Sequence, residues 1–329
     1  MIFTNLASPQ VQNVPKRPSE HQLIILSIVV PVYGNAGSLP ALFGKLQQIE
    51  QRLHIDDVSM DLIFINDGSP DDSMSHLINF KKVRPATTVV KLTRNFGAVH
   101  ASKCGLSFIK GDCFMILAAD LQDPPELIFQ MLTRWKAGSK FITCERTSRG
   151  DPWISRLCSA IFYKLVRGFV MNNYPQKGYD MALMDKSMLA PLVNSSKNIF
   201  TPLLAYWLGY CPDTIHYDRA KRLHGKSGWT FKKKFNSFLD VMLGFSVTPL
   251  RMMSGMGIAV AAVSFSYGAA VIINALFGNI PVPGFAALMA AITFLLGTII
   301  VMLGVIGEYL WRIFDEINKR PEVVVEYVL

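Results

Sequence analysis

The sequence predicts an α/β protein with a doubly wound, mostly parallel sheet, followed by amphipathic interface helices and two transmembrane helices. Two observations support this prediction. Up to residue 144, short apolar runs alternate with helical segments, which is the pattern of a parallel sheet covered by helices on both faces. Further on, residues 252–307 contain no Asp, Glu, Lys, Arg or His, a span long enough for two membrane helices and a turn.

The expected strands cover residues 26–33, 61–66, 87–92, 113–119 and 140–144, and the expected helices cover 38–53, 98–109 and 125–137, with another after Asp72. The strands are apolar runs, as in a sheet buried on both faces. Ligands of such sheets bind at the carboxyl ends of the strands. We therefore expect the functional residues in the loops that follow the strands.

The stretch 120–126, Asp-Leu-Gln-Asp-Pro-Pro-Glu, directly follows the fourth expected strand. It places three carboxylates in a chain whose net charge is +9. Oxygen ligands of this kind suit a Mg²⁺ or Mn²⁺ ion that holds a substrate phosphate. The same residues can start a helix, with Asp123 as N-cap and Glu126 favoured by the helix dipole. We therefore predict Asp120 and Gln122 as metal ligands, and Asp123 and Glu126 as helix-starting residues.

Two other loops follow expected strands. Asp67, in the sequence Asn-Asp-Gly-Ser, could bind ribose hydroxyls or a base. An Asp-Gly turn, with Asp71 or Asp72 capping the next helix, explains the same residues equally well. Arg94 follows the third expected strand, where its guanidinium could bind a phosphate or pair with an acid.

Transmembrane helices are expected at residues 252–277 and 285–311. Basic residues flank this pair and are absent from the turn, so the positive-inside rule places both ends, including residues 1–251, in the cytoplasm. The basic amphipathic segments 153–170 and 231–245 have the composition of membrane-surface helices. We favour this interpretation for the second segment because it continues into a transmembrane helix. For the first, packing against the soluble domain is an equal alternative.

Four segments, taken together and in this order, resemble the inverting GT-A glycosyltransferases of family two. They are Ser-Ile-Val-Val-Pro-Val-Tyr at 27–33, Asn-Asp-Gly-Ser at 66–69, Arg-Asn-Phe-Gly at 94–97 and the acidic stretch at 120–126. More closely, residues 26–329 resemble the polyisoprenyl-phosphate glycosyltransferases. These include the bactoprenol glucosyltransferases, the undecaprenyl-phosphate aminoarabinose transferase and, more distantly, dolichyl-phosphate mannose synthase. The resemblance implies the GT-A fold.

The resemblance also implies roles for individual positions. Contacts to a nucleotide sugar are implied for Pro31, Tyr33, Asp67, Arg94 and Asp120. A Mg²⁺ or Mn²⁺ cofactor is implied on Asp120 and Gln122, catalytic roles for Arg146 and Asp180, and contacts to the acceptor phosphate for Lys226 and Ser227. Many relatives have a second acid two residues before Asp120. This chain has Ala118 there, so fewer carboxylates would hold the metal.

The implied reaction is inverting transfer of a hexose, with glucose from UDP-glucose as first choice, to a polyisoprenyl phosphate of the undecaprenyl type. A modified aminosugar or mannose are the alternatives. The expected partners are a nucleotide sugar, a lipid phosphate and the cytoplasmic face of a bacterial inner membrane, with no nucleic acid. Glycines in the spans allow, without requiring, a homo-oligomer.

The expected domains are a flexible tail (1–22), a cytoplasmic GT-A catalytic domain (23–229), an amphipathic interface helix (230–251), a transmembrane hairpin (252–311) and a cytoplasmic tail (312–329). Two rival functions are less well supported. A processive polysaccharide synthase usually carries a Gln-x-x-Arg-Trp signature, and none follows Asp180. A catalytically inactive membrane scaffold does not explain why Asp67, Asp120, Gln122 and Arg146 are all present.

Overall fold

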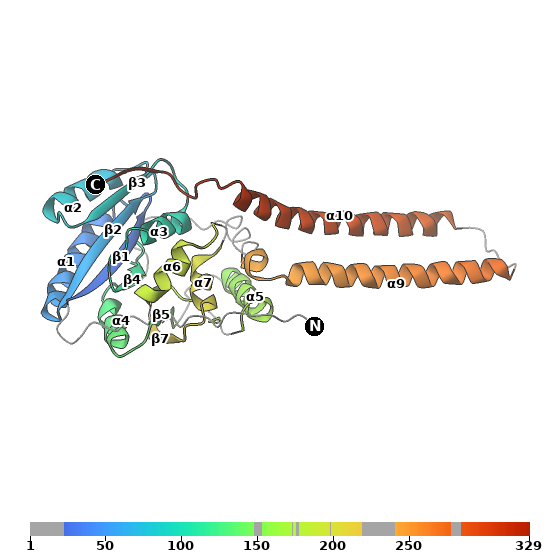
Figure 1. The fold of residues 1–329 in the computed structure, drawn as a ribbon, viewed down its shortest axis with the longest axis horizontal. Coiled ribbons are helices and arrows are strands. Elements are labelled where there is room, and N and C mark those ends of the chain that lie inside the picture. The colour runs from blue at the N-terminus through green and yellow to red at the C-terminus, as the bar shows by residue number, and fades with distance from the viewer. Residues whose placement is uncertain are drawn as a thin grey trace, which may run out of the picture.

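The computed structural model describes residues 23–147, 153–172, 174–175, 178–197, 199–218, 241–277 and 284–329. They form an α/β domain from which a long helical hairpin projects (Figure 1). Residues 1–22, Lys226 and Ser227 lie outside the described residues. So do residues 230–240 of the predicted interface helix (230–251), whose other residues are described and are helical at 241–245 and 248–251.

Eight strands form one sheet in the order β7-β5-β6-β4-β1-β2-β3-β8. The strands are β1 (Ile24–Val32), β2 (Val58–Asn66), β3 (Thr88–Leu92), β4 (Cys113–Ile116), β5 (Phe141–Arg146), β6 (Met181–Asp185), β7 (Pro212–Tyr217) and β8 (Val325–Val328). The central strands β4, β1, β2 and β3 are parallel, as are β5 and β7. β6 is antiparallel to both β4 and β5, and β8 is antiparallel to β3. The predicted mostly parallel α/β sheet is confirmed.

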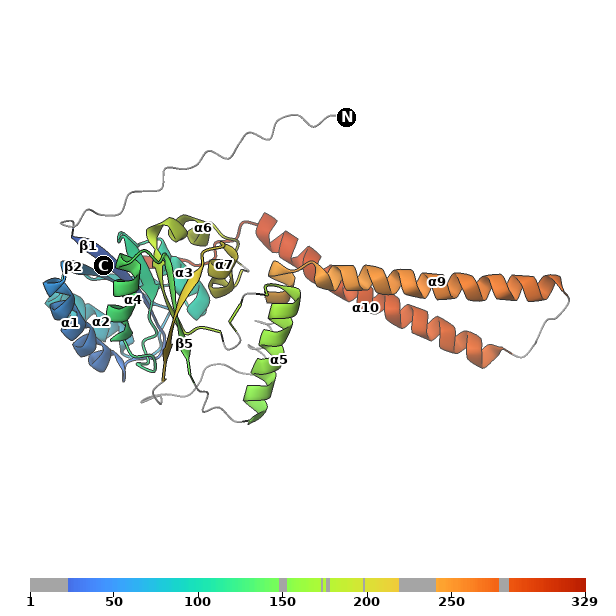
Figure 2. The same ribbon diagram turned by 90° about the horizontal axis from the view of Figure 1, so that it is seen from below.

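Helices cover both faces of this sheet (Figure 2). One face carries α1 (Leu39–Ile55), α2 (Ser73–Val83) and α4 (Leu127–Lys136). The other carries α3 (Ala98–Leu106), α5 (Trp153–Phe169), α6 (Leu189–Val193) and α7 (Thr201–Trp207), with a 3₁₀ helix at Lys186–Met188 before α6. The sequence did not predict β6, β7, β8, α6 or α7.

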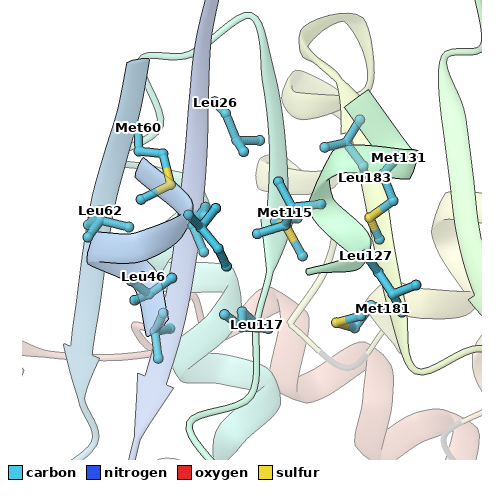
Figure 3. Close-up of a cluster of buried hydrophobic side chains, with 14 of the residues drawn as sticks. Leu26, Leu46, Met60, Leu62, Met115, Leu117, Leu127, Met131, Met181 and Leu183 are labelled. Carbon is cyan, nitrogen blue, oxygen red and sulfur yellow. The ribbon is translucent and has the colours of Figure 1, made fainter. Parts of the chain in front are cut away.

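The larger core lies between the sheet and the helices α1, α2 and α4 (Figure 3). Its α1 side chains recur every three or four residues, which is the spacing of one helix face: Leu39, Leu42, Leu46, Ile49 and Leu53. Four adjacent strands contribute side chains from the sheet: Leu183, Met115, Leu26 and Met60. Burying each such side chain contributes about 1.5 to 3 kcal/mol, so this layer holds the strand ends in fixed positions.

Helix α5 combines the two interpretations that its sequence left open. A smaller core lies on the sheet face that α3, α5, α6 and α7 cover. Val166 is buried in it, and Phe162 and Tyr163 pack against it, so the helix is attached to the α/β domain. Ile161 and Phe169 on the same helix are exposed. The helix therefore packs on the domain and also presents apolar side chains outward.

The hairpin consists of α9 (Thr248–Leu276) and α10 (Phe285–Ile317), both long and apolar enough to cross a membrane. α10 extends beyond the predicted end at residue 311 because no helix breaker interrupts its polar last turns. Two contacts hold its base. Tyr309 Oη donates to the carbonyl oxygen of Ser246 at 3.0 Å, and Lys197 pairs with Asp315 at 2.9 Å.

Residues 312–329 are not a separate tail, contrary to the prediction. They complete α10, and the carboxyl-terminal segment (residues 320–329) then returns to the α/β domain as β8, beside β3. Backbone hydrogen bonds join Leu329 N to the carbonyl oxygen of Val89 at 2.8 Å and Thr93 N to that of Val324 at 3.0 Å. The pairing depends on a partner strand far away in the sequence, which local sequence patterns do not show.

Candidate active site

The carboxyl ends of the parallel strands meet at one edge of the sheet, and the described residues predicted to form the site gather along it. They are Pro31 and Tyr33 at the end of β1, Asp67 after β2, Arg94 after β3, Asp120 and Gln122 after β4, Arg146 at the end of β5 and Asp180 just before the antiparallel β6. The structure places these residues on six neighbouring strands or their loops. It does not test their roles, which remain predictions.

Asp67 joins the loop after β2 to the loop after β3. Its two carboxylate oxygens accept the backbone N–H groups of Phe96 at 2.7 Å and Gly97 at 2.9 Å. Burial raises the pKa of Asp67, and these hydrogen bonds oppose that effect only in part. The loops approach so closely that a Cβ on Gly68 would lie 2.6 Å from the backbone carbon of Arg94. The structural role of Asp67 is therefore to position the loop that carries Arg94.

Arg94 and Tyr33 lie near the contact between the loops after β2 and β3. The Arg94 guanidinium lies over the Phe96 ring, 4.5 Å from its centre. Tyr33 is half-exposed, as a ring available for stacking would be. The loop after β1 is held by Asp71, whose carboxylate accepts Ala36 N at 2.9 Å and Ser73 N at 3.2 Å. Of the two capping candidates, Asp71 therefore makes the bond at the start of α2.

The loop after β4 has a strained turn at the predicted metal ligands. Leu121 has a φ of 55°, a left-handed conformation that costs a residue other than glycine about 1 kcal/mol or more. Its side chain packs against the larger core, and Asp120 Oδ1 accepts Gln122 N at 3.2 Å. Packing and this hydrogen bond together hold the turn.

The ligand set at this turn fits a metal that is bound together with its substrate. Among the described residues, no three His, Cys, Asp or Glu side chains form a ready-made metal site. Asp120 and Gln122 are hard oxygen donors, however, and Mg²⁺ commonly uses one or two carboxylates, with waters and substrate phosphates completing its coordination. We therefore expect Asp120 and Gln122 to hold Mg²⁺ or Mn²⁺ only when a diphosphate is also present.

The prediction that Asp123 and Glu126 start the next helix is wrong for Asp123. Helix α4 begins at Leu127, with Glu126 at the N-cap position, where its side chain makes no capping bond. Glu126 instead pairs with Lys45 at 2.8 Å. Asp123 is buried and accepts a hydrogen bond from Tyr217 Oη at 2.6 Å. The reason is that the turn leading into α4 starts at Pro124, whose carbonyl oxygen accepts Leu127 N at 3.2 Å, while the Asp123 carboxylate is bound by Tyr217.

Arg146 and Asp180 form a two-bond ion pair. Arg146 Nε donates to Asp180 Oδ2 at 2.9 Å, and Arg146 Nη2 donates to Asp180 Oδ1. Both side chains are largely buried. Burial by itself would lower the pKa of Arg146, but the hydrogen bond and charge of Asp180 outweigh it and raise that pKa. The sequence predicted both residues without predicting that they bind each other.

Tyr217 is a member of the site that the sequence did not predict. Its hydroxyl lies 3.1 Å from Asp180 Oδ2 as well as 2.6 Å from Asp123 Oδ1. Burial and the bond to Asp123 raise the pKa of Tyr217 far above its usual value, so the phenol stays protonated as a donor. Little in the sequence pointed to it, because Tyr217 follows the mixed run Pro-Asp-Thr-Ile-His at 212–216, which does not resemble a buried strand.

Comparisons with known proteins identify the family of the chain. The sequence profile of Glycosyl transferase family 2 matches residues 27–190. An uncharacterized glycosyltransferase of Synechocystis is 34% identical over 304 residues, which cover 91% of this chain and 93% of that protein. The SfII prophage-derived bactoprenol glucosyl transferase of Shigella flexneri is 32% identical over 92% of this chain and 97% of its own length. A prophage bactoprenol glucosyl transferase homolog of Escherichia coli is 31% identical over 92% and 99%. The chain therefore belongs to glycosyl transferase family 2 and is a glycosyltransferase with the GT-A fold.

Proposed function

We propose that this enzyme transfers a hexose from a nucleotide diphosphate sugar to a polyisoprenyl phosphate at the cytoplasmic face of a membrane, with inversion at the anomeric carbon. Glucose from UDP-glucose is the preferred donor, because several relatives are named bactoprenol glucosyl transferases. A modified aminosugar or mannose is the alternative. The observation that carries the proposal is the attachment of an apolar hairpin to the sheet edge where the site residues gather.

The hairpin has the surface of a membrane-embedded element. α9 has 29 residues and α10 has 33, so each is about 44 to 50 Å long, more than the hydrocarbon core of a bilayer. Large apolar side chains point outward along both helices, among them Phe265, Phe294 and Leu303. Apolar surface of this extent is not stable in water, whereas a lipid bilayer accommodates it.

The sheet supports a hairpin that crosses the membrane twice. The chain before α9 supplies β1 to β7, and the chain after α10 supplies β8 of the same sheet. This connection supports a topology in which both ends of the hairpin lie on one side of the bilayer. The flanking positions carry Arg251, Arg312, Lys319 and Arg320, and the positive-inside rule favours the cytoplasm for that side.

The end of α10 lies next to the donor side of the site. A small cavity of about 280 Å³ lies between the end of α10 and the loop after β3, and is lined by Arg94, Phe96, Asp315 and Arg320 among others. The loop that carries Arg94 is therefore close to the point where the chain leaves the membrane. An acceptor whose phosphate lies at headgroup level would be within reach of this edge.

A second cavity lies beside α5 and supports a binding position there for the acceptor phosphate. It has a volume of about 560 Å³ and is lined by Tyr163, Lys164 and Arg167 among others. Tyr163 contacts the segment before β6, since a Cβ on Gly178 would lie 2.4 Å from its hydroxyl. The cavity thus combines basic side chains with a contact two residues from Asp180. Lys226 and Ser227, the predicted acceptor-phosphate contacts, remain predictions.

The transfer needs little proton chemistry from the protein. A phosphate monoester has a second pKa of about 6 and is already largely anionic at neutral pH. One of its oxygens attacks the anomeric carbon, the bond to the diphosphate breaks, and the nucleoside diphosphate leaves. Bound Mg²⁺ or Mn²⁺ would supply Lewis-acid stabilisation of the leaving diphosphate. Arg146 would offer a fixed positive charge to the same leaving group, and Asp180 would hold that charge in place.

Transfer by the purified full-length protein tests the proposal. We expect radiolabel from UDP-glucose to enter the lipid phase when undecaprenyl phosphate and Mn²⁺ are present, and EDTA to abolish this transfer. The Asp120→Asn variant should need a higher Mn²⁺ concentration. If no nucleotide sugar of a panel including GDP-mannose transfers its label, the proposal is wrong and the inactive scaffold becomes the better description.

Asp180→Asn separates an orienting role from a base role. If Asp180 orients Arg146, the asparagine variant keeps one oxygen acceptor for the guanidinium and should retain more activity than Asp180→Ala. If Asp180 removes a proton, both variants should lose activity equally, because neither has a carboxylate. The comparison uses initial rates of transfer with Mn²⁺ saturating. We expect asparagine to retain at least about tenfold more activity than alanine, the equivalent of one retained hydrogen bond to a charged group. Equal losses would contradict the orienting role.

A further inference from the structure

The Tyr217 hydroxyl connects two carboxylates that come from different parts of the site. Asp123 belongs to the loop after β4, which also carries the predicted metal ligands Asp120 and Gln122. Asp180 precedes β6 and binds Arg146 through two hydrogen bonds. The distances from the phenol oxygen are 2.6 Å to Asp123 and 3.1 Å to Asp180. One hydroxyl therefore contacts both the donor loop and the Arg146–Asp180 pair.

We propose that Tyr217 is a positioning residue, which fixes the Arg146–Asp180 pair relative to the donor loop through Asp123. The proposal rests on the proposed function, because the donor loop is assigned there to the metal and diphosphate. Arg146 can act on the leaving diphosphate only if the two parts of the site keep a fixed separation.

The frame around Tyr217 is rigid enough for this role. Tyr217 ends β7 and is in register with Arg146, the last residue of β5. Its carbonyl oxygen accepts Thr147 N at 2.8 Å and Thr147 Oγ1 at 3.0 Å. The side chain is only 7% exposed. Backbone pairing and packing therefore hold the ring, and the position of the hydroxyl follows from them.

A hydroxyl suits this position because the two groups it joins are both acidic. Two carboxylates close together repel each other when both are charged. A phenol between them keeps them apart and donates a charge-assisted hydrogen bond, which is stronger than a neutral one. Phenylalanine would preserve the packing of the ring and remove only this connection, so Tyr217→Phe isolates the proposed role.

Hydrogen exchange measured by mass spectrometry tests the connection without depending on any activity. In Tyr217→Phe, we expect amides in the segments 120–126 and 178–181 to exchange about ten- to a hundredfold faster, the equivalent of one lost hydrogen bond to a charged group. Tyr210→Phe is the matched control. It removes a hydroxyl that contacts Ser187 Oγ at 3.3 Å, near the opposite end of β7. It should leave both segments unchanged.

Kinetics tests whether the connection serves the reaction. We expect Tyr217→Phe to lower kcat about ten- to a hundredfold while KM for the nucleotide sugar changes little, with protein concentration corrected for the fraction that binds nucleotide. In an Asp123→Ala background, which removes the acceptor of the Tyr217 hydroxyl, the same substitution should add less than about threefold, because the connection is already broken. If Tyr217 had only a structural role, the two substitutions would lower kcat independently and their fold-losses would multiply.

The outcomes separate the two proposals. Unchanged exchange in both segments would overturn the role of Tyr217, whatever the activity. Faster exchange with unchanged kcat would show that the connection exists but does not serve transfer. This result would also overturn the proposed role of Tyr217. If the unmodified protein transfers no sugar, the proposed function fails, and the exchange experiment still decides whether Tyr217 joins the two segments.

Discussion

Replacing Arg146 with alanine is expected to lower the rate of glycosyl transfer by about 10²- to 10³-fold, the usual effect of removing one preorganised group that stabilises developing charge. The guanidinium is held by Asp180 through two hydrogen bonds and is largely buried. It therefore needs no reorganisation when the diphosphate leaves. Single-turnover transfer with Mn²⁺ saturating measures the effect on the chemical step.

Arg146→Ala should also destabilise the fold, because it leaves the Asp180 carboxylate in a largely buried place without its cation. Breaking such a pair costs about 3 kcal/mol. Arg134→Ala is the matched control, since Arg134 also pairs with an aspartate, Asp213, but both side chains are more than a third exposed. Exposed pairs contribute about 0 to 1 kcal/mol. Thermal unfolding of both variants gives the comparison.

Arg146→Lys distinguishes charge from geometry. Lysine keeps the positive charge but cannot form the planar two-bond pair with Asp180. We expect an activity between those of the unmodified protein and the alanine variant. An alanine variant within tenfold of the unmodified rate would contradict the assignment of Arg146 to the leaving group.

Glu322→Gln is expected to lower the free energy of unfolding by about 2 to 3 kcal/mol, because it removes one charge from a largely buried ion-pair network. Glu322 lies in the carboxyl-terminal segment and binds His100 Nδ1 and Lys103 Nζ, each at 2.8 Å. Lys103 is only 7% exposed, and its ammonium is held by Glu322 together with the carbonyl oxygens of Ser195 and Ser196. His100 and Lys103 both belong to α3, which directly follows the loop carrying Arg94. The variant should therefore raise KM for the nucleotide sugar more than it lowers kcat.

Glu326→Gln provides the control for this prediction. Glu326 pairs with Lys91 at 3.0 Å in the same segment, but the pair is exposed to solvent. Removing it should change the free energy of unfolding by less than about 1 kcal/mol. If the two variants are equally stable, the network around Glu322 does not hold the carboxyl-terminal segment in place.

The Glu322 network also predicts a pH dependence. Burial would raise the pKa of Glu322, but His100 and Lys103 outweigh it, so the pKa lies below the ordinary value of 4.5. A carboxyl with a lowered pKa contributes its stability fully above pH 4.5 and loses it as the pH falls through the lower, folded-state value. Glu322→Gln should therefore flatten the acid side of the stability profile, which denaturant titrations between pH 3 and 7 would show.

The sequence predicted the parts of the fold that local patterns determine. The apolar runs of β1 to β5 and the alternation with helices were sufficient for the parallel sheet. β6 was not predicted, because its residues 181–185 resemble any short apolar run until β4 and β5 are in place on either side. β8 was not predicted because its partner, β3, lies on the other side of the hairpin in the sequence.

The candidate site, too, was predicted only where local sequence patterns determine it. The places of Asp67, Arg94 and Asp120 after strands were predicted from the sequence. Contacts between distant loops were not found. Asp123 was assigned to a helix start because Asp-Pro-Pro is a common way to begin one. Its actual partner, Tyr217, is 94 positions away. Only tertiary structure brings the two together.

The position of β8 has a consequence for how the protein is made. During synthesis the domain cannot be completed when the ribosome finishes β7, because its last strand follows both apolar helices. Until then β3 is an open sheet edge, which is prone to pair with other chains. In the proposed membrane topology, the edge can close only if the second helix has returned the chain to the side from which the first one left. A chain inserted with the wrong number of crossings would then lack this strand, so completing the sheet would be coupled to correct membrane insertion.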